Sequence, residues 1–467
     1  MAVCILWIVW LPGLLGVNVI QFILSFLVAA AAYALAVFYL DSATPDLKVI
    51  WGFAIFFRII LLFTYPSLSD DVYRYSWDGH LMTSGVSPYL YPVNSVLLHP
   101  YNTTLRSLVN HNWMASPYLP VAQFYFMLVN WLAPQTIKAF QITACLCDLG
   151  TGWLIMDMLR MLNLPCQRVL VYLWNPLVIV EFSHAAHMDA WMLVLVFFCF
   201  WFMVKARPGD RGEPGFKWGA ALTLALAILT KGLPVLFLPF VLRRLGWLRI
   251  LGAGAVVVGI SALFAREAGW GITGWVNSGT GLFGALRIYL LEWNYNSGLY
   301  HWLETGLTGY TTARNVPVNV FTGLPILFAK VMASLLLGLS LFFAGLVAWL
   351  KDNPAMADHQ KRTIQMLRLA SVGVMVYLLF ATTVHPWYVT FIIPFLPFWL
   401  PAQDEEVRVG RFIWSWLYFS CIVVLAYSTY IQPGEFQEFD IVRLVEYIPL
   451  YLLLAWACAG IVAKPIR

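Results

Sequence analysis

Residues 19–40 read VIQFILSFLVAAAAYALAVFYL, a run of 22 residues without a charged side chain. A helix of this length spans about 30 Å, which matches the hydrocarbon core of a bilayer. The rest of the chain has the same character, since 61% of its 467 residues are hydrophobic and only 11% are charged. Soluble domains carry roughly 25% charged residues. The composition therefore indicates a polytopic membrane protein.

Apolar segments recur along the whole chain, and they predict an all-α protein with about 11–14 transmembrane helices in a single domain, residues 1–467. Residues 1–17 lack a basic leader, so we expect a first membrane helix there and not a cleavable signal. The short spans around Lys231 and His385 are expected to be broken helices, and 119–133 an interfacial or re-entrant helix. The candidate spans are 1–17, 19–40, 48–65, 138–160, 168–182, 188–205, 217–230, 232–243, 247–265, 321–350, 369–384, 387–401, 411–430 and 442–462.

Lysine and arginine divide the connections into two sets. Cytoplasmic loops carry an excess of these residues, so we expect the sparsely basic loops 66–137 and 266–320, with the turns at 182–188, near His385 and at 431–441, to be extracytoplasmic. The net charge of +5 is explained by basic loops beside a membrane, without a nucleic-acid partner. The connections predicted as cytoplasmic hold Lys48, Arg160, Arg168, Lys205, Arg207, Arg211, Lys217, Arg243, Arg244, Arg249, Lys351, Lys361, Arg362, Arg368, Arg408, Arg411, Lys464 and Arg467.

Residues 68–80, LSDDVYRYSWDGH, gather scarce charge directly after an apolar span. With Ser69 as the N-cap, Asp70 and Asp71 would lie in the first helical turn, where carboxylates suit the helix dipole. Asp71, Arg74 and Asp78 then share one face, joined by Tyr75. A simpler interpretation is an amphipathic interfacial helix whose charges face water.

A second polar cluster, at 175–195, reads NPLVIVEFSHAAHMDAWMLVL. Glu181, His184, His187 and Asp189 stand between two apolar spans. Histidine and carboxylate side chains ligate metals, but the spacing matches no established metal motif, and we assign no metal site. The histidines could instead donate to a phosphate, or the cluster could be ordinary polarity at helix ends.

Two further apolar runs are interrupted by polar residues. Lys231 lies inside LTKGLPVLFLP (229–239), where a buried cation indicates an anionic partner unless the side chain reaches the interface. In TTVHPWYVTFIIPF (382–395), His385 and Pro386 break the run, and Trp387 and Tyr388 offer rings suited to an interface or a sugar. The aromatic loop segment 292–304 suits carbohydrate contacts or loop packing equally well.

These features share the predicted extracytoplasmic side and combine a carboxylate base, cations and aromatic platforms. That combination fits a sugar linked to a lipid phosphate. The sequence contains no P-loop and no GxGxxG motif, so a nucleotide cofactor is not indicated. The seven cysteines lie in or beside apolar segments and are interpreted as buried thiols.

Four groups of motifs, taken together, resemble those of the GT-C membrane glycosyltransferases. They are SDDVYRYSWDG with GVSPY (85–89), NPLVIVE with HMDAW, TKGLPVLFLP, and HPWYVTFIIPF. The similarity spans about residues 48–400 and is greatest to polyprenol-phosphate-mannose-dependent mannosyltransferases. It implies a GT-C-type helical bundle with its active site in extracytoplasmic loops, in a bacterial cytoplasmic membrane. The resemblance also implies inverting transfer of a hexose, mannose first, from a polyprenyl-phosphate donor to a glycan or glycolipid acceptor.

The resemblance assigns the general base to Asp71, with Asp70 in reserve. A phosphate leaving group needs charge neutralisation more than a proton donor, and no cofactor is implied, although the two aspartates could touch a divalent cation. A lipid or sugar transporter is the main alternative, and an O-antigen ligase or acyltransferase is a third. Asp78 is also expected to brace Arg74, and Asp189 is expected to orient a histidine or bind the acceptor. Donor-phosphate contacts are expected from Arg74, His184, His187, Lys231 and His385. Sugar or acceptor contacts are expected from Asp78, Asp189, Glu181, Trp387, Tyr388 and Tyr75.

Overall fold

The computed structural model describes residues 17–40, 44–272, 279–313, 325–352, 358–401, 407–431 and 436–462. These residues are almost entirely helical, and their one β feature is an isolated bridge between Tyr295 and Thr383. The fold confirms an all-α polytopic membrane protein. Seven helical stretches among the described residues are long and apolar enough to cross a bilayer: they lie in α2 (Val17–Phe38), α7 (Ile137–Met161), α13 (Trp247–Ala268), α16 (Pro325–Lys351), α17 (His359–Phe380), α19 (Val407–Ile422) continued by a 3₁₀ helix (Val423–Tyr430), and α20 (Asp440–Val462).

Shorter helices complete the bundle, and two predicted breaks are confirmed. Helix α11 (Glu213–Thr230) ends before Lys231, and the chain continues as a 3₁₀ helix (Leu233–Phe237) and α12 (Leu238–Leu245). Helix α17 ends at Phe380, and α18 (Pro386–Val389) starts directly after His385. The other short helices are α4 (Leu47–Leu62), α5 (Asp71–Thr83), α6 (Pro120–Leu132), α8 (Leu170–Leu173), α9 (Pro176–Ile179), α10 (Asp189–Lys205), α14 (Gly284–Glu292) and α15 (Leu299–Ala313).

Some boundaries differ from the sequence-based expectation. Helix α17 begins ten residues before the predicted 369, because the Asp358 side chain caps it by accepting the backbone N–H of Lys361. Lys361, Arg362 and Arg368 therefore lie within a helix and not in a connection. The expected first span 1–17 falls outside the described residues, apart from Val17.

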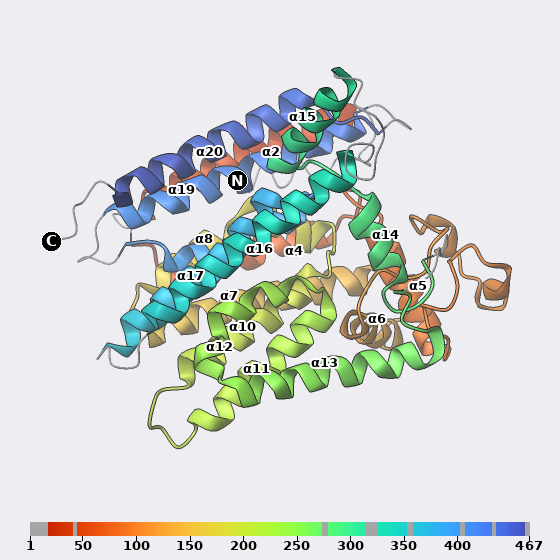
Figure 1. Ribbon diagram of the computed structural model, residues 1–467, viewed down its shortest axis with the longest axis horizontal. Coiled ribbons are helices and arrows are strands. Elements are labelled where there is room, and N and C mark those ends of the chain that lie inside the picture. Colours follow the sequence, from red (N-terminus) through yellow and green to blue (C-terminus); the bar gives the residue numbers. More distant parts are fainter. Residues whose placement is uncertain are drawn as a thin grey trace.

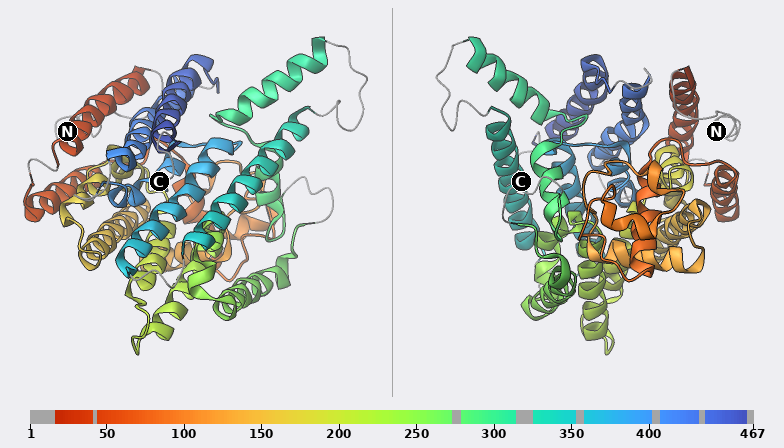
Figure 2. Two further views of the ribbon diagram at one scale, coloured as in Figure 1. Left: turned by 60° about the vertical axis from the view of Figure 1, so that its left-hand side comes forward. Right: turned by 90° about the vertical axis from the view of Figure 1, so that its right-hand side faces the viewer.

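The helices lie roughly side by side, with the two ends of the bundle carrying different segments (Figure 1). Helices α2, α19 and α20 form a group along one side, and α11 and α13 lie along the opposite side. Helices α5, α6 and α14 gather at one end. The end of α16, the start of α17 and the C-terminal end of α20 lie at the other. Figure 2 shows α15 projecting from the body and the segment 84–119 covering the α5 end.

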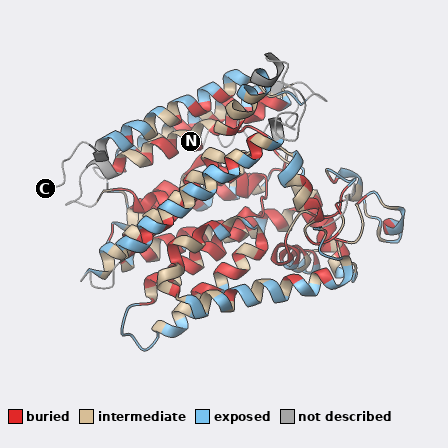
Figure 3. Cartoon of the chain, in the orientation of Figure 1, coloured by how far each residue is buried: buried red, intermediate tan, exposed pale blue. Residues whose placement is uncertain are grey.

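Burial concentrates in the middle of the bundle, around α7, α8, α9 and α10 (Figure 3). The outer helices α13 and α16 expose apolar side chains such as Leu251, Leu263 and Phe342, as expected of helices that face lipid. One buried ion pair joins two central helices: Arg58 Nε on α4 lies 2.5 Å from Asp148 Oδ2 on α7. Tyr172 also donates to Asp148, so this charge pair is enclosed by hydrogen bonds.

Candidate active site

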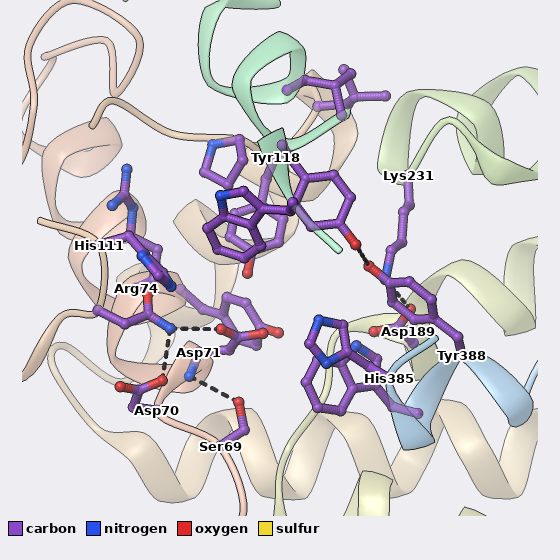
Figure 4. Close-up of a pocket in the computed structure, with 18 of the residues that line it drawn as sticks. Ser69, Asp70, Asp71, Arg74, His111, Tyr118, Asp189, Lys231, His385 and Tyr388 are labelled. Atoms are coloured by element: carbon purple, nitrogen blue, oxygen red, sulfur yellow. Dashed lines mark hydrogen bonds and ion pairs between the residues drawn. The ribbon is translucent and has the colours of Figure 1, made fainter. Parts of the chain in front are cut away.

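A cavity of about 210 Å³ opens beside the start of α5. Its walls come from seven segments that are far apart in the chain: the start of α5, the loop 110–119, the start of α10, the break after α11, helix α14 with the residue after it, the turn into α18, and the end of the 3₁₀ helix after α19. Figure 4 shows Asp70 and Asp71 on one side of this cavity and Lys231, Asp189, Tyr388 and His385 on the other. The two helix breaks thus contribute side chains to one site.

The acidic wall is built at the N-terminus of α5. The helix begins at Asp71 with Asp70 as N-cap, and Ser69 Oγ accepts the Asp71 N–H at 3.2 Å. The N-cap is therefore one residue later than predicted, while Ser69 still satisfies a free backbone donor. Asn110 Nδ2 donates to Asp70 Oδ1 at 2.7 Å and to Asp71 Oδ1 at 2.8 Å. This single amide holds both carboxylates at the cavity wall.

Electrostatics perturb several groups at the site. Asp70 is exposed, yet partial desolvation by the surrounding protein, with the neighbouring charge of Asp71, raises its pKa. Burial lowers the pKa of His111, against the opposing effect of the two carboxylates, so the ring is neutral near pH 7. Burial first, and the charge of Asp71 in addition, raise the pKa of Tyr289 to about 12.

Arg74 lies one turn further along α5 and is fixed from behind. Its Nε lies 3.2 Å from Asp78 Oδ1, and its Nη2 donates to the Met114 carbonyl at 3.1 Å. Asp78 is buried and also accepts from Ser116 and Gln123. The predicted bracing of Arg74 by Asp78 is confirmed.

Lys231 lies across the cavity from the acidic pair. Its Nζ donates to Asp189 Oδ1 at 2.7 Å and lies 4.2 Å from the centre of the Tyr388 ring. The Asp189 carboxylate is almost completely buried, whereas a quarter of the Lys231 side chain is exposed. Asp189 therefore holds the lysine and not a histidine. An ammonium group has three donors, so Lys231 can bind Asp189 and a ligand together.

A stack of rings supports His385. The His385 ring lies parallel to Trp387, 4.2 Å between centroids, and Trp387 stacks in turn on His187 at 4.0 Å. Behind the stack, His187 Nε2 lies 3.3 Å from Glu181 Oε2. The Tyr388 hydroxyl is 2.6 Å from that of Tyr289 on α14. The break before α18 and helix α14 thus together present an imidazole and two phenols.

Comparison with known proteins gives a family. The family model described as alpha-(1->6)-mannopyranosyltransferase, N-terminal domain, matches residues 5–247, slightly more than half of the chain. The chain belongs to this mannopyranosyltransferase family. A curated relative, alpha-(1->6)-mannopyranosyltransferase A of Corynebacterium glutamicum, is 25% identical over 188 residues, which make up 39% of this chain and only 36% of the relative. No solved structure matches.

The family match covers one wall of the cavity and part of the other. Asp70, Asp71, Asp189 and Lys231 lie inside residues 5–247, whereas His385 and Tyr388 come from beyond it. The resemblance to mannosyltransferases noted on the sequence motifs is therefore confirmed. The cavity of this mannopyranosyltransferase family member is completed by its C-terminal half.

Nine of the thirteen residues predicted for the site line the cavity, and four do not. His184 is turned away from it: its ring nitrogens lie 2.7 Å from Thr64 Oγ1 and 2.9 Å from Ser67 Oγ. Burial lowers the pKa of His184 to about 4, so it is neutral and engaged elsewhere. Asp78, Glu181 and His187 lie behind residues of the wall. The nine lining residues are Asp70, Asp71, Arg74, Tyr75, Asp189, Lys231, His385, Trp387 and Tyr388.

Metal-ligand spacing in the His184–Asp189 segment does not produce a ligand cluster. The two histidines and Asp189 face three different sets of partners, described above. Among the described residues, no group of three or more His, Cys, Asp or Glu side chains is arranged to hold a metal ion.

Several lining residues were missed by sequence reasoning. Asn110, His111 and Tyr118 come from the long loop after α5, and Tyr289 and Tyr430 from α14 and the end of the 3₁₀ helix after α19. Trp293 lies in the aromatic segment 292–304, for which the sequence suggested carbohydrate contacts or loop packing. His111 has a left-handed backbone (φ 42°), a conformation that side chains other than glycine rarely adopt. No sequence signal identifies such a position.

Proposed function

We propose that this protein transfers a mannosyl group from a polyprenyl-phosphate-linked donor to a hydroxyl of a glycan or glycolipid acceptor, with Asp71 as general base. The observation that carries the proposal is the cavity itself. A carboxylate held by Asn110 faces a lysine and a histidine across a space lined by aromatic rings. Membership of the mannopyranosyltransferase family supports mannose as the sugar.

Asp71 suits the base better than Asp70. It lies in the first turn of α5, its backbone N–H donates to Ser69 Oγ, and its carboxylate accepts from Asn110. Asp70 is the more exposed member of the pair and lies further from Lys231 and His385 across the cavity. In Figure 4 the Asp71 carboxylate is on the side of the pair nearer His385, which is where the acceptor would approach.

One carboxylate is sufficient for this transfer reaction. Asp71 takes the proton of the acceptor hydroxyl, the acceptor oxygen forms a bond to the anomeric carbon, and the bond from that carbon to the phosphate oxygen breaks. Asp71 lies on one side of the cavity, and Lys231 and His385 lie on the other, an arrangement that supports displacement with inversion. A phosphate leaves as an anion, so no second carboxylic acid is required, in contrast to glycosidases.

Lys231, Arg74 and His385 are the proposed donor-phosphate contacts. Lys231 and Arg74 supply charge-assisted donors, and both are fixed by buried carboxylates that stop them from closing on Asp71. Tyr75, Trp387 and Tyr388 are proposed to contact sugar or acceptor. Asp78, Asp189, Glu181 and His187 are positioning residues in this scheme, since each contacts a wall residue from behind or beside the cavity.

We propose that the cavity faces the extracytoplasmic side of a bacterial cytoplasmic membrane. It lies at the end of the bundle that carries α5, α6 and α14, and strongly basic segments such as 205–217 and 243–249 lie toward the other end (Figure 1). The positive-inside rule assigns the basic end to the cytoplasm.

The deciding experiment compares Asp71→Asn with Asp70→Asn in purified full-length protein, using polyprenyl-phosphate mannose and a mannan-type acceptor. Loss of a general base typically lowers the rate by about 100-fold to 10,000-fold, and we expect this loss for Asp71→Asn. Asn can still accept the Asn110 hydrogen bond, so the fold should persist, as judged by an unchanged melting temperature.

Asp70→Asn is the matched control and should retain a far larger share of the activity. Full transfer by Asp71→Asn would refute the assignment of the base. Uptake or flipping of the lipid-linked sugar without transfer would favour the transporter alternative, and a panel of other polyprenyl-phosphate sugars checks the choice of mannose.

A further inference from the structure

A second cavity, of about 260 Å³, lies at the opposite end of the bundle from the candidate active site. Its walls come from the ends of α10 and α12, the starts of α11 and α17, and the residue after α16. Four permanently charged cations line it against two carboxylates. The cations are Lys217, Arg243, Arg244 and Arg362, and the carboxylates are Glu213 and Asp352.

Both carboxylates are already engaged by cations of the same wall. Asp352 Oδ1 lies 2.9 Å from Arg244 Nη2 and 2.9 Å from Arg362 Nη2. Glu213 pairs with Lys217 at 2.6 Å, one turn away on α11. Because two arginines share one aspartate, the wall keeps a net positive charge after every pairing.

Two groups at this wall are placed to meet an anion. Arg243 donates to the Trp349 backbone carbonyl and lies over the Trp349 ring at 5.3 Å; within the described chain, no carboxylate lies within ion-pairing distance of it. His359 Nε2 is buried without a hydrogen-bond partner among the described residues. A buried polar nitrogen without a partner costs free energy, and His359 is one of the residues that line this cavity.

Exposed tryptophan and leucine side chains lie at the same end of the bundle as this cavity. Trp218, Trp247 and Trp349 are all substantially exposed at this end of the bundle. Tryptophan side chains concentrate at the membrane–water boundary, and Leu248 and Leu251 beside Trp247 are exposed as lipid-facing residues would be. Basic pockets between membrane helices on this side are suited to phosphate headgroups.

We propose that this cavity binds an anionic phosphate group, with Arg243 and the Glu213-paired Lys217 as contacts and the Asp352-linked arginines as its fixed wall. An anionic phospholipid headgroup and free inorganic phosphate share this chemistry. The site is separate from the candidate active site and does not depend on the function proposed for it.

The test measures binding to full-length protein in neutral detergent by native mass spectrometry and thermal shift. Dioleoylphosphatidylglycerol, zwitterionic dioleoylphosphatidylcholine and inorganic phosphate are titrated separately. Removing one cation from such a site costs roughly fivefold in affinity, so we expect that loss for Arg243→Gln and a loss above tenfold for Lys217→Gln/Arg243→Gln. Arg249→Gln is the matched control, because Arg249 contacts the Leu245 carbonyl and Trp218 but does not line the cavity.

Phosphatidylglycerol binding that weakens in the cavity variants identifies a lipid headgroup as the ligand. The same dependence with inorganic phosphate alone identifies the free anion, and either result supports the site. Equal binding by wild type and the double variant for both probes would overturn it, as would an equal loss in Arg249→Gln. Melting temperatures without added ligand show whether each variant is folded, and the Lys217–Glu213 pair, which spans one helical turn near the surface, should contribute little to stability.

Discussion

At the scale of single residues, the cavity pairs each charge with a fixed partner. Asn110 serves both aspartates, Asp78 holds Arg74, and Asp189 holds Lys231. These partners lie between 4 and 42 positions away in the sequence. Preorganised charges of this kind reduce the reorganisation needed when charge develops on a leaving group.

Asp70 makes stability depend on pH in a direction that can be tested. Its folded-state pKa is raised, so its contribution to stability is present below the unfolded pKa and is lost as the pH rises through the folded pKa. Asp70→Asn should therefore raise the melting temperature at pH 7, on the order of 1–2 °C because the carboxylate is partly exposed to solvent. The gain should vanish near pH 3, where wild-type Asp70 is protonated. Scanning fluorimetry at both pH values measures this, and an equal gain at both would contradict a raised pKa.

Lys231 and Asp189 should behave as a coupled pair. Lys231→Met leaves the buried Asp189 carboxylate without its partner, which typically costs about 3–5 kcal/mol. Adding Asp189→Asn removes the stranded charge, so the double variant should be more stable than Lys231→Met. Denaturation of the four proteins completes the cycle. Additive effects would show that the 2.7 Å contact carries no coupling.

At the scale of elements, the position of Asp71 depends on how closely α5 approaches α6. Gly79 lies at this contact. A Cβ atom added to Gly79 would overlap the backbone carbonyl oxygen of Phe126 and would lie 2.8 Å from the carbonyl carbon of the same residue. Asn130 on α6 also donates to Thr83 at the end of α5. The two helices are thus locked at a separation that only glycine allows.

Gly79→Ala should force α5 away from α6 and lower both stability and transfer activity. We expect a loss of about 1–3 kcal/mol from overpacking and a fall in activity of tenfold or more, since Asp71 moves with the helix. Gly254→Ala on α13 is the control, because nothing lies within 4 Å of its added Cβ. It should be neutral or slightly stabilising. A Gly79→Ala variant with unchanged activity would show that the acidic pair does not depend on this packing.

Sequence predicted the helix breaks better than the helix starts. Pro386 after His385, and the Lys-Gly-Leu-Pro run at 231–234, break helices by local chemistry, and both breaks are present. Helix α17, by contrast, begins at a cap before a polar first turn. A hydropathy criterion excludes such a turn, although it is part of the helix.

At the scale of the whole molecule, the two cavities occupy opposite ends of the bundle and differ in charge. The first has three carboxylates and two permanent cations on its walls, and the second has two carboxylates and four cations. The positive-inside rule then predicts that they face different compartments.

Cysteine labelling in intact cells tests this orientation. Thr104→Cys lies in the exposed loop after α5, and Asp210→Cys in the exposed connection before α11. In a background with Cys458 replaced, since that thiol is exposed, a membrane-impermeant maleimide should label Thr104→Cys in intact spheroplasts. Asp210→Cys should react only after permeabilisation. The reverse pattern would place the candidate active site in the cytoplasm.

The sequence by itself determined the class of the molecule and the positions where polar chemistry interrupts it. Apolar runs long enough to span a bilayer, and charges confined to their ends, are local properties that hydropathy and residue type report directly. The tertiary structure alone decided which of those polar residues share a cavity. Histidines three positions apart diverged: His184 turned to Thr64 and Ser67, and His187 stacked on Trp387. Asn110, in contrast, joined Asp70 and Asp71. Such contacts arise because helices distant in sequence must bury their polar groups against one another, and no local pattern encodes that choice.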